Sequence, residues 1–309
     1  LRLGVTGIHN VEGKAYLDAF RELERLGQLR LRVLFHPPVE LLPELVASGV
    51  RSGQGSDRLR IGGVKLFLDG SLGSRTAWML EPYEHSRDRG MPITDESVAR
   101  DAVRLAAHAG IASTIHAIGD AAVRRALDLL TGLPRAAVPH RIEHFQCVHP
   151  DDLGRAASLG VVLSMQPAHL LTDIPLVERH WGARGAGVYN FRTLIETGAT
   201  LAFGSDAPVA PLDPRPGVYA ALDRRADGGP AGGWRPAERL DFAQAVWAYT
   251  RGSAVAEGMS GRRGTIAPGF DADLVAWDVD PALFRGDGSA FLAGHAALTV
   301  VDGSVVMRA

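Results

Sequence analysis

Four residues that can bind a metal ion or move a proton follow apolar runs in the sequence. Lys65 lies in GVKLFLDG, His116 in TIHAIGD, His144 in RIEHFQ and Asp206 in FGSDAPV. For any single histidine, a place in the core or on the surface is the commoner explanation. Four such residues at the same ends of successive strands favour a metal site instead. Imidazole nitrogen and carboxylate oxygen are ligands of first-row metals, and catalytic zinc keeps one position open for water.

Lys65 is the least ordinary member of this group. A lysine on an alternating strand usually points to solvent, but the run from Ile61 to Leu68 offers no polar face for it to share. Burial lowers the pKa of a lysine and yields a neutral amine. Such an amine can form a carbamate with CO2, and the two carbamate oxygens could bridge two metal ions. This chemistry would make Lys65 a ligand.

Strand-like and helix-like segments alternate along the chain. Gly27, Gly110, Gly132 and Gly160 stand where the predicted helices should end. Seven strands are predicted, at residues 3–10, 29–36, 62–69, 112–119, 139–146, 160–167 and 199–206. Helices are predicted at residues 15–27, 97–110, 120–132 and 150–160.

This order indicates parallel strands, for which two architectures are available. An open doubly wound sheet would carry a Gly-rich phosphate loop after the first strand, and GVTGIHNVEG has none. A TIM (β/α)8 barrel gathers the ends of its strands at one mouth, as the polar residues require. We therefore predict an α/β barrel domain over residues 1–257, with one strand fewer than eight. Residues 258–309 contain short β segments and an Asp302-Gly303 turn, which predict a small β domain that other strands must complete.

Composition narrows the classes of partner. The 309 residues carry a net charge of −2, which gives no electrostatic footprint for nucleic acid or an anionic membrane. No apolar run approaches the length of a membrane span. A single cysteine, Cys147, cannot form an internal disulfide and suits a reducing compartment, most simply the cytoplasm. A small-molecule substrate is expected, and the sequence leaves a homo-oligomer open.

Several motifs together resemble the metal-dependent amidohydrolase superfamily. The resemblance is greatest to its amidohydrolase-3 group, which includes the N-substituted formamide deformylases, and it covers essentially the whole chain. The motifs occur in family order: GGVKLFLDGSLGSRTA, IHAIGDAAV, RIEHFQ, SMQPAHLLTD, ETGATLAFGSDAPVAPLDP and GTIAPGFDADLVAWD.

The resemblance implies a (β/α)8 barrel beside a β-sandwich built from both ends of the chain. It implies that Lys65, His116, His144 and Asp206 bind a divalent metal, most simply one or two zinc ions, with Lys65 carbamylated. It also implies that Asp206 takes a proton from the metal-bound water.

Family members carry a His-x-His pair at the end of strand one, and this sequence has no such pair. GVTGIHN is similar to family strand two, so His9 falls one strand too late to replace it. We interpret the chain as N-terminally truncated, with two expected ligands absent.

Further residues near the strand ends have weaker signals. Asp69 and Arg75 lie after the strand of Lys65, while Gln166 and His169 follow the strand at 160–167. All four are predicted to bind substrate at the barrel mouth. Two nearby acidic residues are predicted to have structural roles. Asp120 should cap a helix, and Glu143 should pair with an Arg or Lys in the outer layer.

Three functions are compatible with the sequence. The first is a hydrolase of amide-like, non-peptide C-N bonds that uses a metal-activated hydroxide. The second is an inactive or complementation-dependent fragment that lacks the His-x-His ligands. The third is a deaminase of a cyclic amidine-type substrate.

Overall fold

Two parallel sheets contain all seven predicted strands in a computed structural model that describes residues 1–280 and 288–309. The first sheet has the order β1-β2-β3, and the second has the order β4-β5-β6-β7-β8. The first consists of β1 (Gly7–Asn10), β2 (Arg32–Phe35) and β3 (Leu59–Ile61). The second consists of β4 (Val64–Phe67), β5 (Ser113–Ala117), β6 (Arg141–His144), β7 (Val162–Met165) and β8 (Thr200–Phe203). Only β3 was not predicted as a separate strand.

The two sheets meet beside Lys65. The backbone N–H of Lys65 donates to the Pro37 carbonyl at 2.8 Å, and the N–H of Gly62 donates to the Phe35 carbonyl at 2.7 Å. At the other side of the molecule, no pairing between β8 and β1 is found among the described residues. Residues of both strands instead line a cavity of about 440 Å³. The structure thus shows an α/β fold of parallel sheets and does not show a closed barrel.

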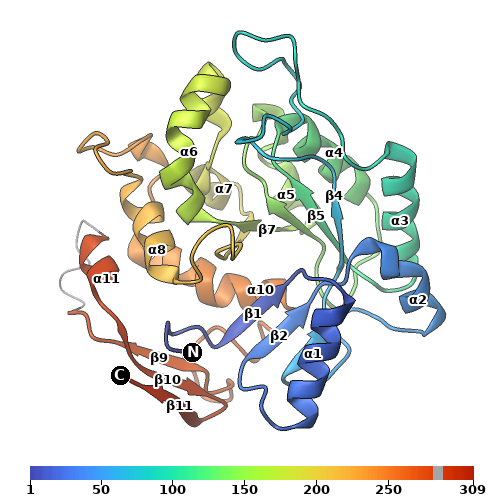
Figure 1. The fold of residues 1–309 in the computed structure, drawn as a ribbon, viewed down its shortest axis with the longest axis vertical. Coiled ribbons are helices and arrows are strands. Elements are labelled where there is room, and N and C mark those ends of the chain that lie inside the picture. Colours follow the sequence, from blue (N-terminus) through green and yellow to red (C-terminus); the bar gives the residue numbers. More distant parts are fainter. Residues whose placement is uncertain (281–287) are drawn as a thin grey trace.

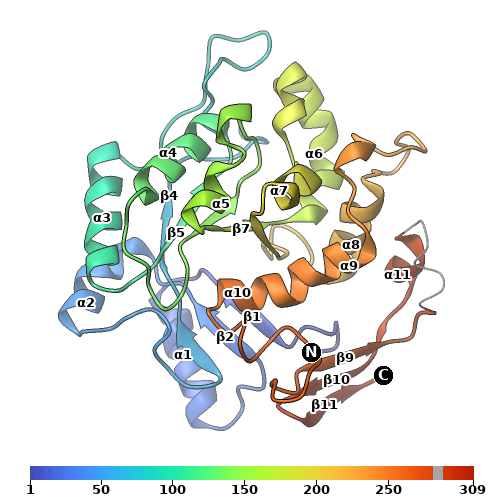
Figure 2. The ribbon, with the colours of Figure 1, turned by 180° about the vertical axis from the view of Figure 1, so that it is seen from behind.

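Helices cover the outer side of the second sheet and pack against the first (Figures 1 and 2). The four predicted helices are confirmed as α1 (Lys14–Arg25), α3 (Glu96–His108), α4 (Asp120–Leu130) and α5 (Arg155–Leu159), the last after a short η2 (Pro150–Asp152). The further helices are α2 (Leu42–Ala47), α6 (Pro167–His180), α7 (Phe191–Glu196), α8 (Pro214–Asp223), α9 (Phe242–Trp247), α10 (Ser253–Ala256) and α11 (Ser289–Ala293). Shorter turns are η1 (Val39–Leu41), η3 (Gly182–Gly187), η4 (Pro236–Glu238) and η5 (Ala248–Gly252). Among the described residues, no helix has the length and apolar character needed to cross a membrane.

Glycines end these helices as predicted, but one cap differs. Gly27 and Gly160 follow α1 and α5 with φ of +67° and +66°, a conformation that glycine adopts without steric cost. Asp120 was predicted as an N-cap, and this prediction is wrong. Gly119 holds the cap position, and the Asp120 carboxylate accepts a hydrogen bond from the backbone N–H of Leu80 at 2.7 Å.

Side chains of the second sheet divide by the alternation of its strands. One face is apolar and packs beneath the helices; it consists of Leu66, Ile115, Ile142, Leu163 and Leu201, each at most 1% exposed. The opposite face is polar and includes Lys65, Thr114, His116, Arg141, Glu143 and Ser164, all of them buried. Glu143 was expected in the outer layer. The predicted location is wrong, because Glu143 lies on the inner face. The predicted pairing with an arginine is confirmed, since Arg141 Nε donates to Glu143 Oε1 at 2.6 Å.

A separate antiparallel sheet ends the chain. Its order is β11-β10-β9, formed by β9 (Leu274–Trp277), β10 (Ala296–Val301) and β11 (Ser304–Arg308). The predicted turn at Asp302-Gly303 is confirmed, with φ of +56° and +72°. Both chain ends lie at this sheet (Figure 1), where Thr299 Oγ1 donates to the Leu1 carbonyl at 2.9 Å. Among the described residues, this antiparallel sheet has no second antiparallel sheet packed on it, so the predicted sandwich is not seen.

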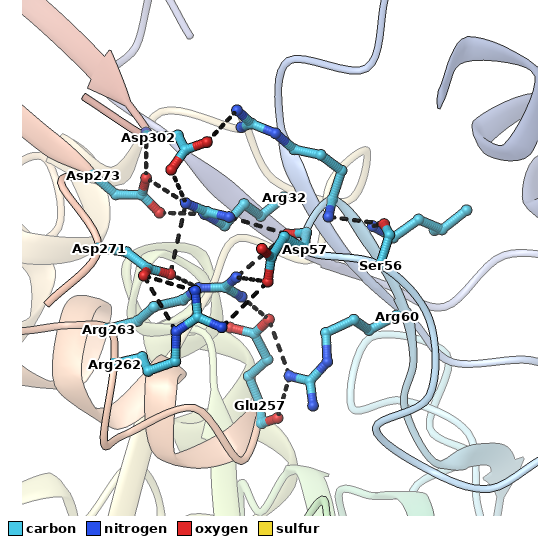
Figure 3. A network of polar contacts seen from close by, with 12 residues as sticks. Arg32, Ser56, Asp57, Arg60, Glu257, Arg262, Arg263, Asp271, Asp273 and Asp302 are labelled. Carbon is cyan, nitrogen blue, oxygen red and sulfur yellow. Dashed lines mark hydrogen bonds and ion pairs between the residues drawn. The ribbon is translucent and has the colours of Figure 1, made fainter. Parts of the chain in front are cut away.

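A network of charged side chains joins the C-terminal segment to the first sheet (Figure 3). Arg32 is buried on β2, and its Nε donates to Asp273 Oδ2 at 2.5 Å. Its Nη2 forms an ion pair with Asp271 Oδ2 at 3.6 Å. Arg263 continues the network by donating to Asp271 at 2.9 Å and pairing with Glu257. Since charges removed from water need partners, each member depends on the others.

We expect Arg32→Met to lower the free energy of unfolding by about 3 kcal/mol, because it leaves the half-buried Asp273 without its arginine partner and removes one of the cations beside Asp271. Urea denaturation followed by circular dichroism measures this change. Arg58→Met is the matched control. Arg58 pairs with the exposed Asp302 at 3.5 Å, so its loss should cost less than about 1 kcal/mol. Equal losses in the two variants would contradict a stabilising role for the buried network.

Candidate metal centre

The side chains of His144, His169 and Asp206 converge at the carboxyl ends of the strands of the second sheet. One ligand atom from each lies within 4.8 Å of the others. His144 is the last residue of β6, Asp206 lies three residues after β8, and His169 is in the first turn of α6. The Nε2 atom of His169 is enclosed, and no described residue gives it a hydrogen bond. Two imidazoles and a carboxylate at this separation match the donor set of a catalytic zinc-type site.

Unusual backbone conformations place two of these residues. His144 and Phe145 have φ of +72° and +45°, and Asp206 has φ of +58°. Positive φ is uncommon outside glycine and persists where the surroundings impose it, often at functional sites. After β6, the N–H of Phe145 donates to the Ala117 carbonyl at 3.1 Å, and the N–H of Cys147 donates to the Ile118 carbonyl at 2.9 Å. These bonds turn the chain sharply and aim His144 at the site.

The other two predicted ligands lie beside this group. The ring centroids of His116 and His144 are 4.4 Å apart, although His116 is not one of the three residues whose ligand atoms converge. His116 Nε2 donates a hydrogen bond to the Gly70 carbonyl at 3.0 Å. In the neutral ring, the lone pair is then on Nδ1. Lys65 is buried, and its Nζ lies 4.5 Å from the centre of the Phe67 ring. The structure therefore brings His144 and Asp206 together with His169 and places His116 against His144, while metal binding by Lys65 and His116 stays a prediction.

Burial sets the charge of these groups. It lowers the pKa of His116 to about 4, helped by the charge of Lys65, and holds the pKa of His144 well below its usual value. Both imidazoles are therefore neutral near pH 7, the form that binds metals. Burial also lowers the pKa of Lys65 to about 8, against the opposing charges of Glu143 and Asp206. The pKa of Asp206 is raised, again mainly by burial.

Asp69 is held by backbone hydrogen bonds just after β4. Its side chain is completely buried. Oδ1 accepts a hydrogen bond from the N–H of Ile118 at 3.0 Å, and Oδ2 accepts from the N–H groups of Trp78 and Gly119, both at 2.8 Å. Oδ1 is also 3.6 Å from Nε2 of His116. Substrate binding by Asp69 stays a prediction, and its three hydrogen bonds also indicate a positioning role for the loop and the β5–α4 turn.

Arg75 and Gln166 remain predicted substrate ligands. Arg75 is exposed, and its guanidinium lies 5.6 Å from the centre of the Tyr83 ring. Gln166 is buried and lines the 440 Å³ cavity together with Asp206. His169, predicted beside them as a substrate ligand, lies instead among the metal-ligand candidates described above.

Sequence reasoning missed the role of Arg141. Beyond its bond to Glu143, its Nη1 lies 2.6 Å from His9 Nδ1, and its Nη2 donates to Ser164 Oγ at 2.7 Å. The guanidinium therefore ties β6 to β7 and, through His9, to β1. The signal was available, because Arg141 and Glu143 are two residues apart on one strand and must share a face.

Comparison with known proteins places this geometry in context. The sequence matches the amidohydrolase family (Amidohydro_3) over residues 1–307. It is 32% identical over 254 residues to the amidohydrolase-family protein YtcJ of Bacillus subtilis (strain 168), covering 80% of this chain and 47% of that protein. It is also 32% identical over 278 residues to Protein LONG AFTER FAR-RED 3 of Arabidopsis thaliana, covering 86% of this chain and 48% of that protein.

A solved structure gives the same result for the fold. The chain superposes on an uncharacterized metal-dependent hydrolase from Pyrococcus horikoshii OT3 with a TM-score of 0.78 and 36% sequence identity. The superposition covers 86% of this chain and 54% of that one. The chain thus spans about half the length of the curated relatives it matches.

The hydrogen bonds of Asp69 generate a stability prediction. Asp69→Ala leaves three buried backbone N–H groups without their acceptor, so we expect the free energy of unfolding to fall by about 3 kcal/mol. Asp101→Ala is the control, because Asp101 is exposed on α3 and should change stability by no more than about 0.5 kcal/mol. Urea denaturation compares the two. If Asp69→Ala unfolds at the same urea concentration as the control, the positioning role of Asp69 is wrong.

Proposed function

Because the chain belongs to the amidohydrolase family, we propose that it carries the site of a metal-dependent hydrolase that cleaves amide-like, non-peptide C-N bonds. The observation that carries the proposal is the convergence of His144, His169 and Asp206. Hydrolase activity is supported by the family, and the type of bond is our inference from the site.

A divalent cation, with zinc as the first choice, fits these residues. His144 is neutral, His169 presents an enclosed Nε2 that has no partner among the described residues, and Asp206 offers a carboxylate. His116 and Lys65 lie next to this set and would complete it. When bound, such a cation supplies a Lewis acid that polarises a carbonyl group and makes a water molecule more acidic.

Asp206 is the residue that would move the proton. Burial raises the pKa of its carboxyl group, which brings the group closer to the pH at which it can both accept and release a proton. As water adds to the carbonyl carbon, its proton passes to an Asp206 carboxylate oxygen. The same proton then passes to the departing nitrogen as the C-N bond breaks. Gln166 lines the same cavity and would orient the substrate.

Lys65 is proposed to react with CO2. Its Nζ is buried beside Phe67, and its pKa of about 8 makes a neutral amine accessible near neutral pH. The nitrogen lone pair would form an N–C bond to CO2, with loss of one proton from nitrogen, to give a carbamate anion. That anion would add oxygen ligands at the edge occupied by His116.

Metal and activity measurements test the main proposal. We expect purified protein to contain a stoichiometric divalent metal and to hydrolyse N-substituted formamides, with activity lost on chelation and restored by zinc. Asp206→Asn should lower kcat by at least about 100-fold, because it removes the proton carrier. Asp101→Asn, an exposed acid on α3, should leave kcat unchanged. Inductively coupled plasma mass spectrometry and initial-rate assays provide both readouts.

The same assays separate the alternatives. Turnover of cyclic amidines, with no turnover of formamides, would identify a deaminase. Metal-free and inert protein would contradict the proposal and favour a fragment that requires a complementing segment.

The carbamate can be tested directly because the sequence contains only two lysines, Lys14 and Lys65. With 13C-labelled bicarbonate, we expect a carbamate carbon resonance in the NMR spectrum that survives Lys14→Arg and vanishes in Lys65→Arg. Lys14 is the matched control, since it is exposed and forms only a 3.6 Å ion pair with Glu44. A spectrum without a Lys65-dependent resonance would refute carbamylation.

A further inference from the structure

A hydrogen-bond cluster of Asp173, Tyr189 and Gln146 lies next to the candidate metal centre. Asp173 Oδ2 accepts a hydrogen bond from Tyr189 OH at 2.6 Å and another from Gln146 Nε2 at 2.8 Å. The backbone N–H of Tyr189 also donates to the Gln146 carbonyl at 3.1 Å. The three residues therefore form a closed set of contacts, in which one carboxylate oxygen joins three separate chain segments.

The cluster is connected to both histidines of the centre. Asp173 lies four residues after His169 on α6, so the two side chains share one face of that helix. Gln146 lies two residues after His144, directly beyond the turn that aims this histidine. Asp173 thus links the helix that carries one metal-ligand candidate to the loop that carries the other.

The loop at His144 needs such support. His144 and Phe145 both have positive φ, a conformation that costs free energy for residues with a Cβ atom. On one side, the loop is held by hydrogen bonds to Ala117 and Ile118 of the β5 segment. On the other side, contacts run from Gln146 to Asp173 and Tyr189, and from Cys147 to Val188. Without Asp173, the side-chain part of that second support is lost.

We propose that Asp173 is a positioning residue that fixes the separation of His144 and His169 by clamping Gln146 and Tyr189. The inference rests on the proposed metal-binding function for its purpose. The clamp itself stands on the hydrogen bonds above, so it can be tested without any metal.

Hydrogen exchange measured by mass spectrometry or NMR tests the clamp in the full chain. We expect Asp173→Leu to speed exchange of the Phe145 and Cys147 amides by about tenfold, because lost hydrogen bonds allow local opening. Amides within β4 should not change. Asp173→Asn retains one acceptor oxygen and should show a smaller effect. Glu178→Leu is the matched control, an exposed acid on the same helix. If Asp173→Leu fails to fold, Tyr189→Phe removes one of the two bonds and should give the same local effect.

Titration of metal-free protein with Co²⁺, followed by visible absorption, tests the consequence. We expect Asp173→Leu to weaken Co²⁺ binding by about 10- to 100-fold, with partial rescue in Asp173→Asn. Glu178→Leu should bind Co²⁺ as the unaltered chain does.

Hydrogen exchange and Co²⁺ affinity test different parts of the proposal. Unchanged exchange at residues 145–147 in both Asp173→Leu and Tyr189→Phe overturns the clamp. Faster exchange with unchanged Co²⁺ affinity overturns the positioning role. If the unaltered chain binds no Co²⁺, the proposed metal function fails, and the positioning role is overturned with it, whereas the exchange result still decides the clamp.

Discussion

The alternation of side chains along β4 to β8 is the constraint on which the site depends. In this parallel register, Lys65 lies opposite Thr114, Thr114 opposite Arg141, and Glu143 opposite Ser164. Since successive residues of a strand face opposite sides, the apolar residues between them are directed to the helices. A shift of one residue would exchange the two faces and bury the polar groups in the apolar core. The hydrophobic core therefore fixes the position of the polar groups on the inner face.

Buried polar groups on the inner face are stabilised by one another. Arg141 is central, because its three nitrogens contact Glu143, His9 and Ser164, so that a charge removed from water is fully partnered. At the ends of the strands the same requirement is met by backbone groups, as the three N–H donors to Asp69 show. Within the described part of the chain, the candidate site thus combines residues that hydrogen-bond to one another with a few polar atoms that have no partner. His169 Nε2 is such an atom, and a bound cation would give it a ligand bond.

Sequence patterns were sufficient for much of the fold. Apolar runs marked the strands, and glycines marked the helix ends, because both follow from local backbone preferences. The strand-end positions of His116, His144 and Asp206 followed from the same patterns. The place of His169 did not, since it depends on how α6 packs after β7. The hydrogen-bond partners of Asp69 and Asp120 were not predicted either. Their carboxylates accept bonds from backbone N–H groups of other segments, and residue type alone does not reveal such partners.

Binding of one divalent cation by His144, His169 and Asp206 is the proposal on which the others depend. X-ray diffraction from crystals grown with zinc, with data collected on both sides of the zinc absorption edge, tests it most directly. We expect an anomalous peak within bonding distance of all three side chains. Absence of a peak there, or a peak bound by Lys65 and His116 without His169, would contradict it.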